Sequence, residues 1–343
     1  MKAPKFVIPV LLAITIALVS QAGVGYTLAN DKVSIVYPAL PAKVEVANNI
    51  TSAEPELVET SSLDDTNPSQ YTPANQPEVV MPNDPYVDQQ WVLSKIKIFQ
   101  LWQIARVEEG VLVAVLDTGI DPDHQDLKGL VIAEANFTDS SNPNDVYGHG
   151  THVAGIIAAK NDDVGIVGVA SGCRLLNAKV ADDVGRCRAS SLAEGIIWAV
   201  NNGASVINIS LEIKEPSPQL EEAIDYAWSR GNVIIAAAGN DGNESPVYPA
   251  YYKNCVAVAA INQDGNLAPL SNYGDWVDVA APGFDIYSTL PNNDYGYKTG
   301  TSFATAYVSG MAALLFNVVT DTNGDDRLND EVRAAIETWL SGN

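Results

Sequence analysis

The chain of 343 residues is poor in cysteine and in basic residues. Its three cysteines, Cys173, Cys187 and Cys255, permit one disulfide at most and have the spacing of neither a disulfide framework nor a metal site. We expect Cys173 and Cys255 to be small buried core residues. Only 19 Lys and Arg stand against 42 Asp and Glu, a formal net charge of -23 at pH 7. This charge argues against nucleic acid as a partner and suits a soluble secreted protein that binds divalent cations.

Histidine is also scarce, which narrows the search for a general base to three residues. His124 lies in the polar stretch DPDHQDL and is interpreted as a solvated loop residue. His149 and His152 begin the apolar run that contains GIIAA, but no third ligand at metal-site spacing accompanies them. Gly148 and Gly150 flank His149 and let backbone and substrate approach closely. We therefore predict His149 as the base and His152 as a packed structural residue.

Three segments place an acid, a base and a hydroxyl in order along the chain. They are VLDTGID at 115–121, GHGTHVAG at 148–155 and GTSFATAYVSG at 300–310. Asp117, His149 and Ser302 would supply an orienting carboxylate, a general base and a nucleophile for acyl transfer. Each residue alone is an ordinary choice at a turn or a helix start. Their joint occurrence predicts a serine peptidase, and no cysteine lies in these segments to serve as nucleophile instead.

The local patterns agree with this interpretation. The runs VLVAVL at 111–116 and VIIAAA at 233–238 are too short for buried helices and predict strands buried on both faces of a parallel sheet. Asp117 and Asn240 then lie at carboxyl ends of strands, on one rim of the sheet. Ser302 precedes the helical stretch FATAYVSGMAALLF, so its hydroxyl is expected at a helix N-terminus, where negative charge is stabilised.

The remaining segments alternate between strand and helix patterns. Strands are predicted near 174–180, 205–210 and 255–260, and helices near 98–107, 189–201, 218–229 and 329–340. This alternation predicts right-handed crossovers and a three-layer α/β fold, with a mostly parallel central sheet and helices on both faces. About 260 residues suit one domain, which we place at 83–343.

The amino-terminal region is predicted to be removed. Residues 1–22 combine Lys2 and Lys5, an apolar stretch at 7–19 and a small-residue cleavage pattern, which indicates an export signal. An uncleaved anchor is the less favoured alternative, because a membrane span needs about 20 apolar residues. Residues 23–82 are rich in polar residues and proline, with a strand predicted only at 33–37, and form a leader that ends between Met81 and Asp84. We expect a secreted, extracellular monomer with no stable membrane span after signal cleavage.

Four further motifs accompany the three segments: NDPY at 83–86, AAAGN at 236–240, YPAYY at 248–252 and DVAAPG at 278–283. Over 83–340 the sequence resembles the subtilisin family of serine endopeptidases, and most closely its thermitase-like branch. The resemblance implies a zymogen that cleaves protein or peptide substrates through an acyl-enzyme intermediate. Its Asp-His-Ser order is that of subtilisin itself, and the matching oxyanion donor is Asn240 beside the Ser302 amide.

The resemblance also implies a substrate-binding segment. Its residues are Ser210, Leu211, Glu212, Ala237 and Gly239. Glu212 and Ile213 replace the two glycines of the family's SLGG motif, so Glu212 is expected to favour basic or hinder acidic side chains of the substrate.

A structural Ca2+ ion is a further implication of the resemblance. The matching ligands are the carboxylates of Asp84, Asp126 and Asp162 and the backbone carbonyls of Lys160, Val164 and Ile166. The alternative is that these acidic loops are merely solvated.

A second acidic segment, DTNGDDRLND at 321–330, resembles the start of an EF-hand loop but is incomplete. Asp326 replaces the usual glycine, and Val332 stands where a bidentate carboxylate belongs. A polar loop with Asn329 capping the next helix explains the segment at least as well.

A function of another class stays open at this point: a secreted binding or scaffold protein that keeps the subtilase shell without turnover. The altered substrate segment supports it. Labelling of Ser302 by a serine-directed reagent distinguishes the two.

Overall fold

The computed structural model describes residues 25–29, 32–36, 82–107 and 110–341. The chain divides into two units, Met1–Val80 and Met81–Asn343. In the first unit, strands β1 (Gly25–Ala29) and β2 (Lys32–Val36) form an antiparallel hairpin, which confirms the strand predicted at 33–37 to within one residue. The predicted export signal and most of the predicted leader lie outside the described residues.

A seven-stranded sheet forms the centre of the second unit, with the strand order β4-β5-β3-β6-β7-β8-β9. Its strands are β3 (Leu112–Asp117), β4 (Val131–Asn136), β5 (Arg174–Lys179), β6 (Val206–Ile209), β7 (Val233–Ala237), β8 (Val256–Ile261) and β9 (Val279–Pro282). Every neighbouring pair is parallel, so the carboxyl ends of β3, β6 and β7 meet at one edge.

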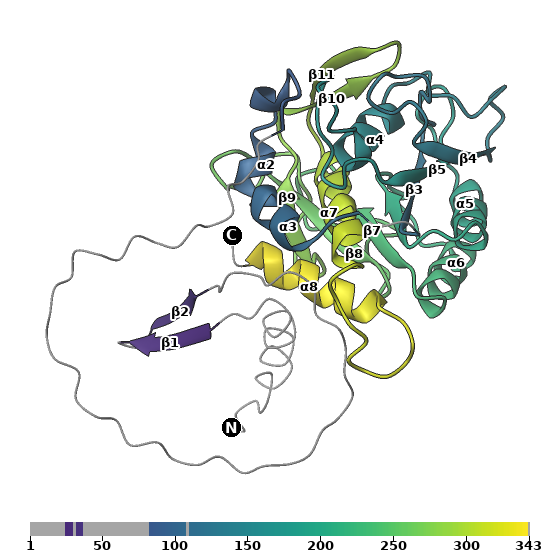
Figure 1. Cartoon of the computed structure of the whole chain (residues 1–343). Coiled ribbons are helices and arrows are strands. Elements are labelled where there is room, and N and C mark those ends of the chain that lie inside the picture. The colour runs from purple at the N-terminus through teal and green to yellow at the C-terminus, as the bar shows by residue number, and fades with distance from the viewer. Residues whose placement is uncertain (1–24, 30–31, 37–81, 108–109, 342–343) are drawn as a thin grey trace, which may run out of the picture. The chain divides into compact units, whose positions relative to one another are not determined.

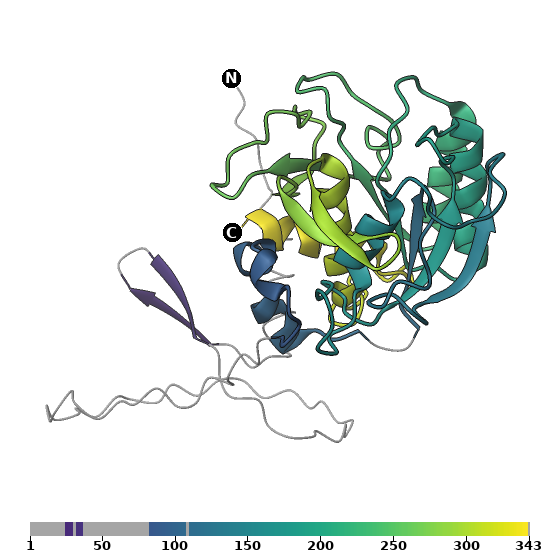
Figure 2. The same cartoon turned by 90° about the horizontal axis from the view of Figure 1, so that it is seen from above.

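Helices cover both faces of this sheet (Figure 1 and Figure 2). One face packs against α2 (Val92–Lys95), α3 (Ile98–Ile104), α4 (Gly150–Ala158), α7 (Thr301–Leu315) and α8 (Asn329–Ser341), and the other against α5 (Ala189–Asn201) and α6 (Pro218–Ser229). Along β3 the side chains alternate between the two cores: Val113 and Val115 lie in the first, Ala114 and Leu116 in the second. The predicted three-layer α/β fold is confirmed.

Helix α7 runs through the first core, and all of its residues are buried. Small residues make this possible: a Cβ on Gly310 would lie 2.6 Å from Cβ of Val169, so only glycine lets the Val169 side chain pack directly against the helix backbone there. The surface helix α6 is amphipathic by contrast, and it begins with Ser217 accepting the Leu220 amide and with Pro218 in its first turn. Among the described residues no helix has the length and apolar character that a bilayer crossing requires.

The predicted strands and helices of the second unit are confirmed, but a hairpin was not predicted. Strands β10 (Ile286–Leu290) and β11 (Asp294–Lys298) pair antiparallel across a turn in which Asn292 and Asn293 have φ values of 67° and 60°. Asparagine tolerates this left-handed conformation better than most residues. The hairpin packs against α4, where the Ser288 hydroxyl donates to the His152 carbonyl at 2.8 Å.

Cys173, Cys187 and Cys255 are all unpaired. Cys173 and Cys255 are buried in the two cores, as predicted.

Candidate active site

Asp117 and His149 form a direct hydrogen bond where a strand and a helix meet. Asp117 is the buried last residue of β3, and His149 immediately precedes α4. The Asp117 Oδ1 atom lies 2.7 Å from Nδ1 of His149 and accepts the Thr118 amide at the same distance. A Cβ on Gly150 would overlap the Gly119 carbonyl, so only glycine lets the helix start this close to the strand end.

Asp145 holds the loop that carries His149. Its Oδ1 atom accepts the Thr118 hydroxyl at 2.9 Å and the Gly148 amide at 2.7 Å, and its Oδ2 atom accepts the Thr151 amide at 2.8 Å. Burial raises the pKa of this carboxyl above its usual range. Sequence reasoning missed Asp145, although an acidic residue four positions before His149 was a visible signal.

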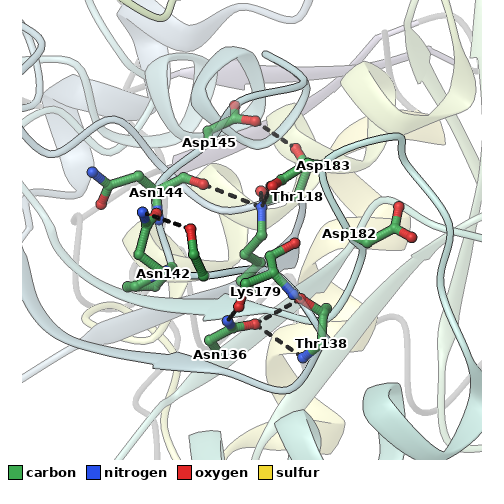
Figure 3. A network of polar contacts seen from close by, with 12 residues as sticks. Thr118, Asn136, Thr138, Asn142, Asn144, Asp145, Lys179, Asp182 and Asp183 are labelled. Carbon is green, nitrogen blue, oxygen red and sulfur yellow. Dashed lines mark hydrogen bonds and ion pairs between the residues drawn. The ribbon is translucent and has the colours of Figure 1, made fainter.

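Lys179, the last residue of β5, lies beside the end of β3 and points its ammonium toward Thr118 (Figure 3). It pairs with Asp117 in the register of β3 and β5 and is fully buried. Its ammonium donates to the carbonyls of Thr118 and Asn144, the latter at 3.1 Å, and lies 2.9 Å from a carboxylate oxygen of Asp183. Two carbonyls accept its N–H groups and the Asp183 carboxylate supplies the opposite charge, which makes its burial tolerable.

Ser302 lies in the first turn of α7 and is clamped to the end of β6. Its hydroxyl donates to the Ser210 carbonyl at 2.9 Å, and the Ser210 hydroxyl donates to the Ser302 carbonyl at 2.8 Å. Asn240, three residues beyond β7, accepts the Thr301 amide at 2.9 Å through its side-chain oxygen. Because the oxygen caps the helix, the amide nitrogen of Asn240 is the end left to donate.

The structure brings the four residues of the predicted catalytic group to the predicted edge of the sheet. They are Asp117, His149, Ser302 and Asn240. The His149 ring lies 5.4 Å from the ring of Phe303, centroid to centroid, next to Ser302. Among the described residues, His149 and Ser302 share no hydrogen bond; the hydroxyl is directed at Ser210 instead. Catalytic hydrogen bonds are often absent or long without substrate, and a rotation about the Cα–Cβ bond of Ser302 redirects its hydroxyl.

The predicted substrate-binding residues lie on the two strand extensions beside Ser302. Ser210 and Leu211 follow β6, and Ala237 ends β7. The Glu212 side chain reaches from one extension to the other: a Cβ on Gly239 would lie 2.7 Å from Oε2 of Glu212.

The carboxylates predicted to bind calcium also converge. Asp84 and Asp126 are buried, and Oδ1 of Asp84 accepts the Asp162 amide at 3.2 Å. Burial raises the pKa of Asp126 to about 6. The Ile166 amide and the Tyr295 hydroxyl bind this carboxyl and oppose the rise, and the nearby Asp162 and Asp84 carboxylates add to it. Burial likewise raises the pKa of Asp84. Uncompensated negative charge is thus concentrated here.

Several oxygens at this place lack partners. Oδ2 of Asp84 is buried with no hydrogen bond, and among the described residues none is made to the carbonyls of Lys160, Val164 or Ile166. A Cβ on Gly165 would overlap the Asp126 carboxylate, so this glycine, which sequence reasoning missed, lets the loop close over it. Among the described residues, no three His, Cys, Asp or Glu side chains form a metal cluster by themselves, so backbone oxygens must complete the set. This hard-oxygen set fits Ca2+.

Two histidines are buried outside the candidate catalytic group. His152 is a packed structural residue, as predicted, and its Nε2 atom lies 3.1 Å from the Gly296 carbonyl. The prediction of a solvated His124 is wrong: the side chain is buried beneath the β10–β11 hairpin, edge-on to the Tyr295 ring and 3.2 Å from the Asp294 carbonyl. Burial lowers the pKa of His124 below its usual value.

The acidic segment at 321–330 is a self-contained polar loop. The Asp321 carboxylate accepts the amides of Gly324 and Asp326 at 2.7 and 2.9 Å, and Asp325 pairs with Arg327. Asn329 begins α8, but its side-chain oxygen accepts no hydrogen bond, so the predicted side-chain cap is wrong; its amide nitrogen donates to the Trp228 carbonyl at 3.2 Å.

A histidine bonded to a buried carboxylate, beside a serine at a helix N-terminus and an amide donor, is the arrangement of serine hydrolases. The model of the subtilase family matches residues 108–339. A thermophilic serine proteinase from Bacillus sp. (strain AK1) is 45% identical over 238 residues, which cover 69% of this chain and 58% of that protein. Thermitase from Thermoactinomyces vulgaris is 44% identical over 259 residues, 75% of this chain and 90% of thermitase.

The chain belongs to the subtilase family, which places it among the serine endopeptidases. Within that family it is similar to thermitase.

Proposed function

We propose that the chain is a secreted, calcium-stabilised endopeptidase that cleaves protein and peptide substrates with Asp117, His149 and Ser302. The observation that carries the proposal is the 2.7 Å bond between Asp117 and Nδ1 of His149, which leaves Nε2 of the ring as the base. The site lies at the carboxyl edge of a parallel sheet, where such folds bind ligands.

In the proposed reaction, the Ser302 hydroxyl leaves the Ser210 carbonyl, gives its proton to Nε2 of His149 and attacks the peptide carbonyl. Asp117 holds the ring in the tautomer with a proton on Nδ1 and stabilises the imidazolium that forms. The negative oxygen of the tetrahedral intermediate is held by the amide nitrogen of Asn240 and the Ser302 backbone amide. His149 then protonates the leaving amine, and a water molecule hydrolyses the acyl-enzyme through the same base.

Calcium in this proposal is structural. Asp84, Asp126 and Asp162 would hold it with the carbonyls of Lys160, Val164 and Ile166. When bound, the ion neutralises carboxylates that repel one another and ties the segment after residue 82 to the rest of the domain.

Secretion as a zymogen rests on the predicted export signal and leader. The charge of -23 supports a soluble extracellular monomer that does not bind nucleic acid.

The test is digestion of an unfolded protein by the mature chain, with fragments identified by mass spectrometry. Cleavage by the native chain and none by Ser302→Ala is expected. Intact substrate after incubation with correctly folded native chain contradicts the proposal and favours the scaffold alternative.

A further inference from the structure

Glu212 occupies a place next to the proposed nucleophile. It lies two residues beyond Ser210, whose carbonyl accepts the Ser302 hydroxyl. Its carboxylate crosses to the extension of β7 and rests against Gly239, the neighbour of Asn240. The side chain therefore spans the two backbone segments that border Ser302.

The charges around Glu212 do not balance. Lys214 lies 2.6 Å from Oε1 of Glu212 and also pairs with Asp241, so one ammonium serves two carboxylates. Oε2 of Glu212 is buried, and no donor among the described residues binds it. A carboxylate oxygen in that state gains from a cationic partner.

A substrate bound at Ser302 is positioned to supply such a partner. An acyl carbon joined to Oγ of Ser302, with its oxygen toward the amide of Asn240, lies against the extension of β7. The side chain on the acyl side of the scissile bond, the P1 side chain, then extends toward Gly239 and the carboxylate that covers it. Val247 and Asn272 also approach Gly239, at 3.2 and 2.6 Å from the position of its absent Cβ, and form the rest of this wall.

We propose that Glu212 makes the enzyme selective for substrates with a lysine or arginine at P1. This inference rests on the proposed peptidase function and assigns its substrate class. The P1 cation adds a donor to the free oxygen of Glu212, whereas an acidic P1 side chain meets the net negative charge of Glu212, Lys214 and Asp241.

The experiment compares kcat/KM for peptides that differ only at P1: lysine, norleucine, alanine and glutamate. Norleucine has the length of lysine without its charge, so the ratio of lysine to norleucine isolates the ammonium. We expect a ratio of about 10 or more in the native chain, falling toward 1 in Glu212→Gln. Lys214→Met removes the competing cation and should raise the ratio. Glu215→Gln is the matched control, because it removes the same charge from an exposed neighbour.

The outcomes are distinct. A ratio near 1 that Glu212→Gln does not change, with peptides still cleaved, overturns the proposal and leaves the peptidase function intact. The proposal is also overturned if the native chain prefers alanine at P1 and Glu212→Gln improves cleavage after norleucine and after lysine by the same factor. Glu212 would then act by its size and not by its charge. Cleavage of no peptide by the folded native chain contradicts the peptidase function and with it this proposal. A high ratio that falls with added salt and is lost only in Glu212→Gln supports it.

Discussion

The hydroxyl of Ser302 donates to the backbone carbonyl of Ser210 at 2.9 Å rather than to a histidine. The first turn of α7 is thereby fixed to the end of β6, and the proposed nucleophile rests against a carbonyl that cannot take its proton. In the proposed reaction, this bond is exchanged for one to His149 when substrate binds. Asp117 already holds the imidazole in place for this exchange.

Removal of the Asn240 amide should slow turnover and leave substrate binding nearly unchanged. Asn240→Ala is expected to lower kcat about 100-fold to 1000-fold, the range established for the matching donor of subtilisin itself. Steady-state kinetics on one peptide give both constants. Since Asn240 also caps α7 through its oxygen, the thermal midpoint must be measured in parallel. An unchanged kcat in a folded variant removes Asn240 from the oxyanion site.

Replacement of the buried lysine should destabilise the domain. Lys179→Met leaves the carbonyls of Thr118 and Asn144 without their donor, which is expected to cost about 3 kcal/mol in the free energy of unfolding. Urea denaturation in a Ser302→Ala background, which prevents self-digestion, measures the loss. Lys128→Met is the control, because Lys128 is exposed. Equal stability of the two variants would show that the Lys179 contacts contribute nothing.

Calcium removal should lower the thermal midpoint. A chelator added to Ser302→Ala leaves the carboxylates of Asp84, Asp126 and Asp162 uncompensated, and restored Ca2+ at 1,000 times its dissociation constant should return about 4 kcal/mol. Asp84→Asn is expected to lose most of this response. Asp123→Asn, which alters an exposed carboxylate nearby, should retain it. A midpoint that is insensitive to the chelator contradicts the calcium site.

Acid should destabilise the fold through His152. Burial lowers the pKa of His152 to about 3, against an ordinary value of 6.5. Between these two pH values the unfolded chain therefore binds a proton on His152 that the folded chain does not bind. The stability from this residue is complete above pH 6.5 and is lost as the pH falls toward 3. His152→Gln in the Ser302→Ala background should reduce the slope of thermal midpoint against pH between 6.5 and 4. Identical slopes would contradict this assignment.

The parts of the fold with continuous apolar runs were predictable from sequence. The run ending at Asp117 and the run before Asn240 indicate buried parallel strands, and their ends necessarily share an edge. The long apolar stretch after Ser302 likewise predicts α7. Local periodicity fixes these elements because each is buried on both faces or throughout.

What escaped prediction depends on contacts between distant segments. The β10–β11 hairpin reads as a polar, tyrosine-rich loop, and because it was not predicted, the burial of His124 beneath it was not either. Asp145 and Gly165 act through backbone amides and close approach, which leave no periodic signal. The direction of the Ser302 hydroxyl is set by a carbonyl 92 residues away in sequence, a relationship only coordinates supply.

The most direct test of the catalytic account is covalent labelling with a serine-directed organophosphorus or sulfonyl reagent, followed by peptide mapping. We expect one modified residue, Ser302, with labelling abolished in Ser302→Ala and strongly slowed in both His149→Ala and Asp117→Asn. A native, folded chain that the reagent leaves unmodified, or labelling at Ser302 whose rate is the same with and without the His149 side chain, would contradict it.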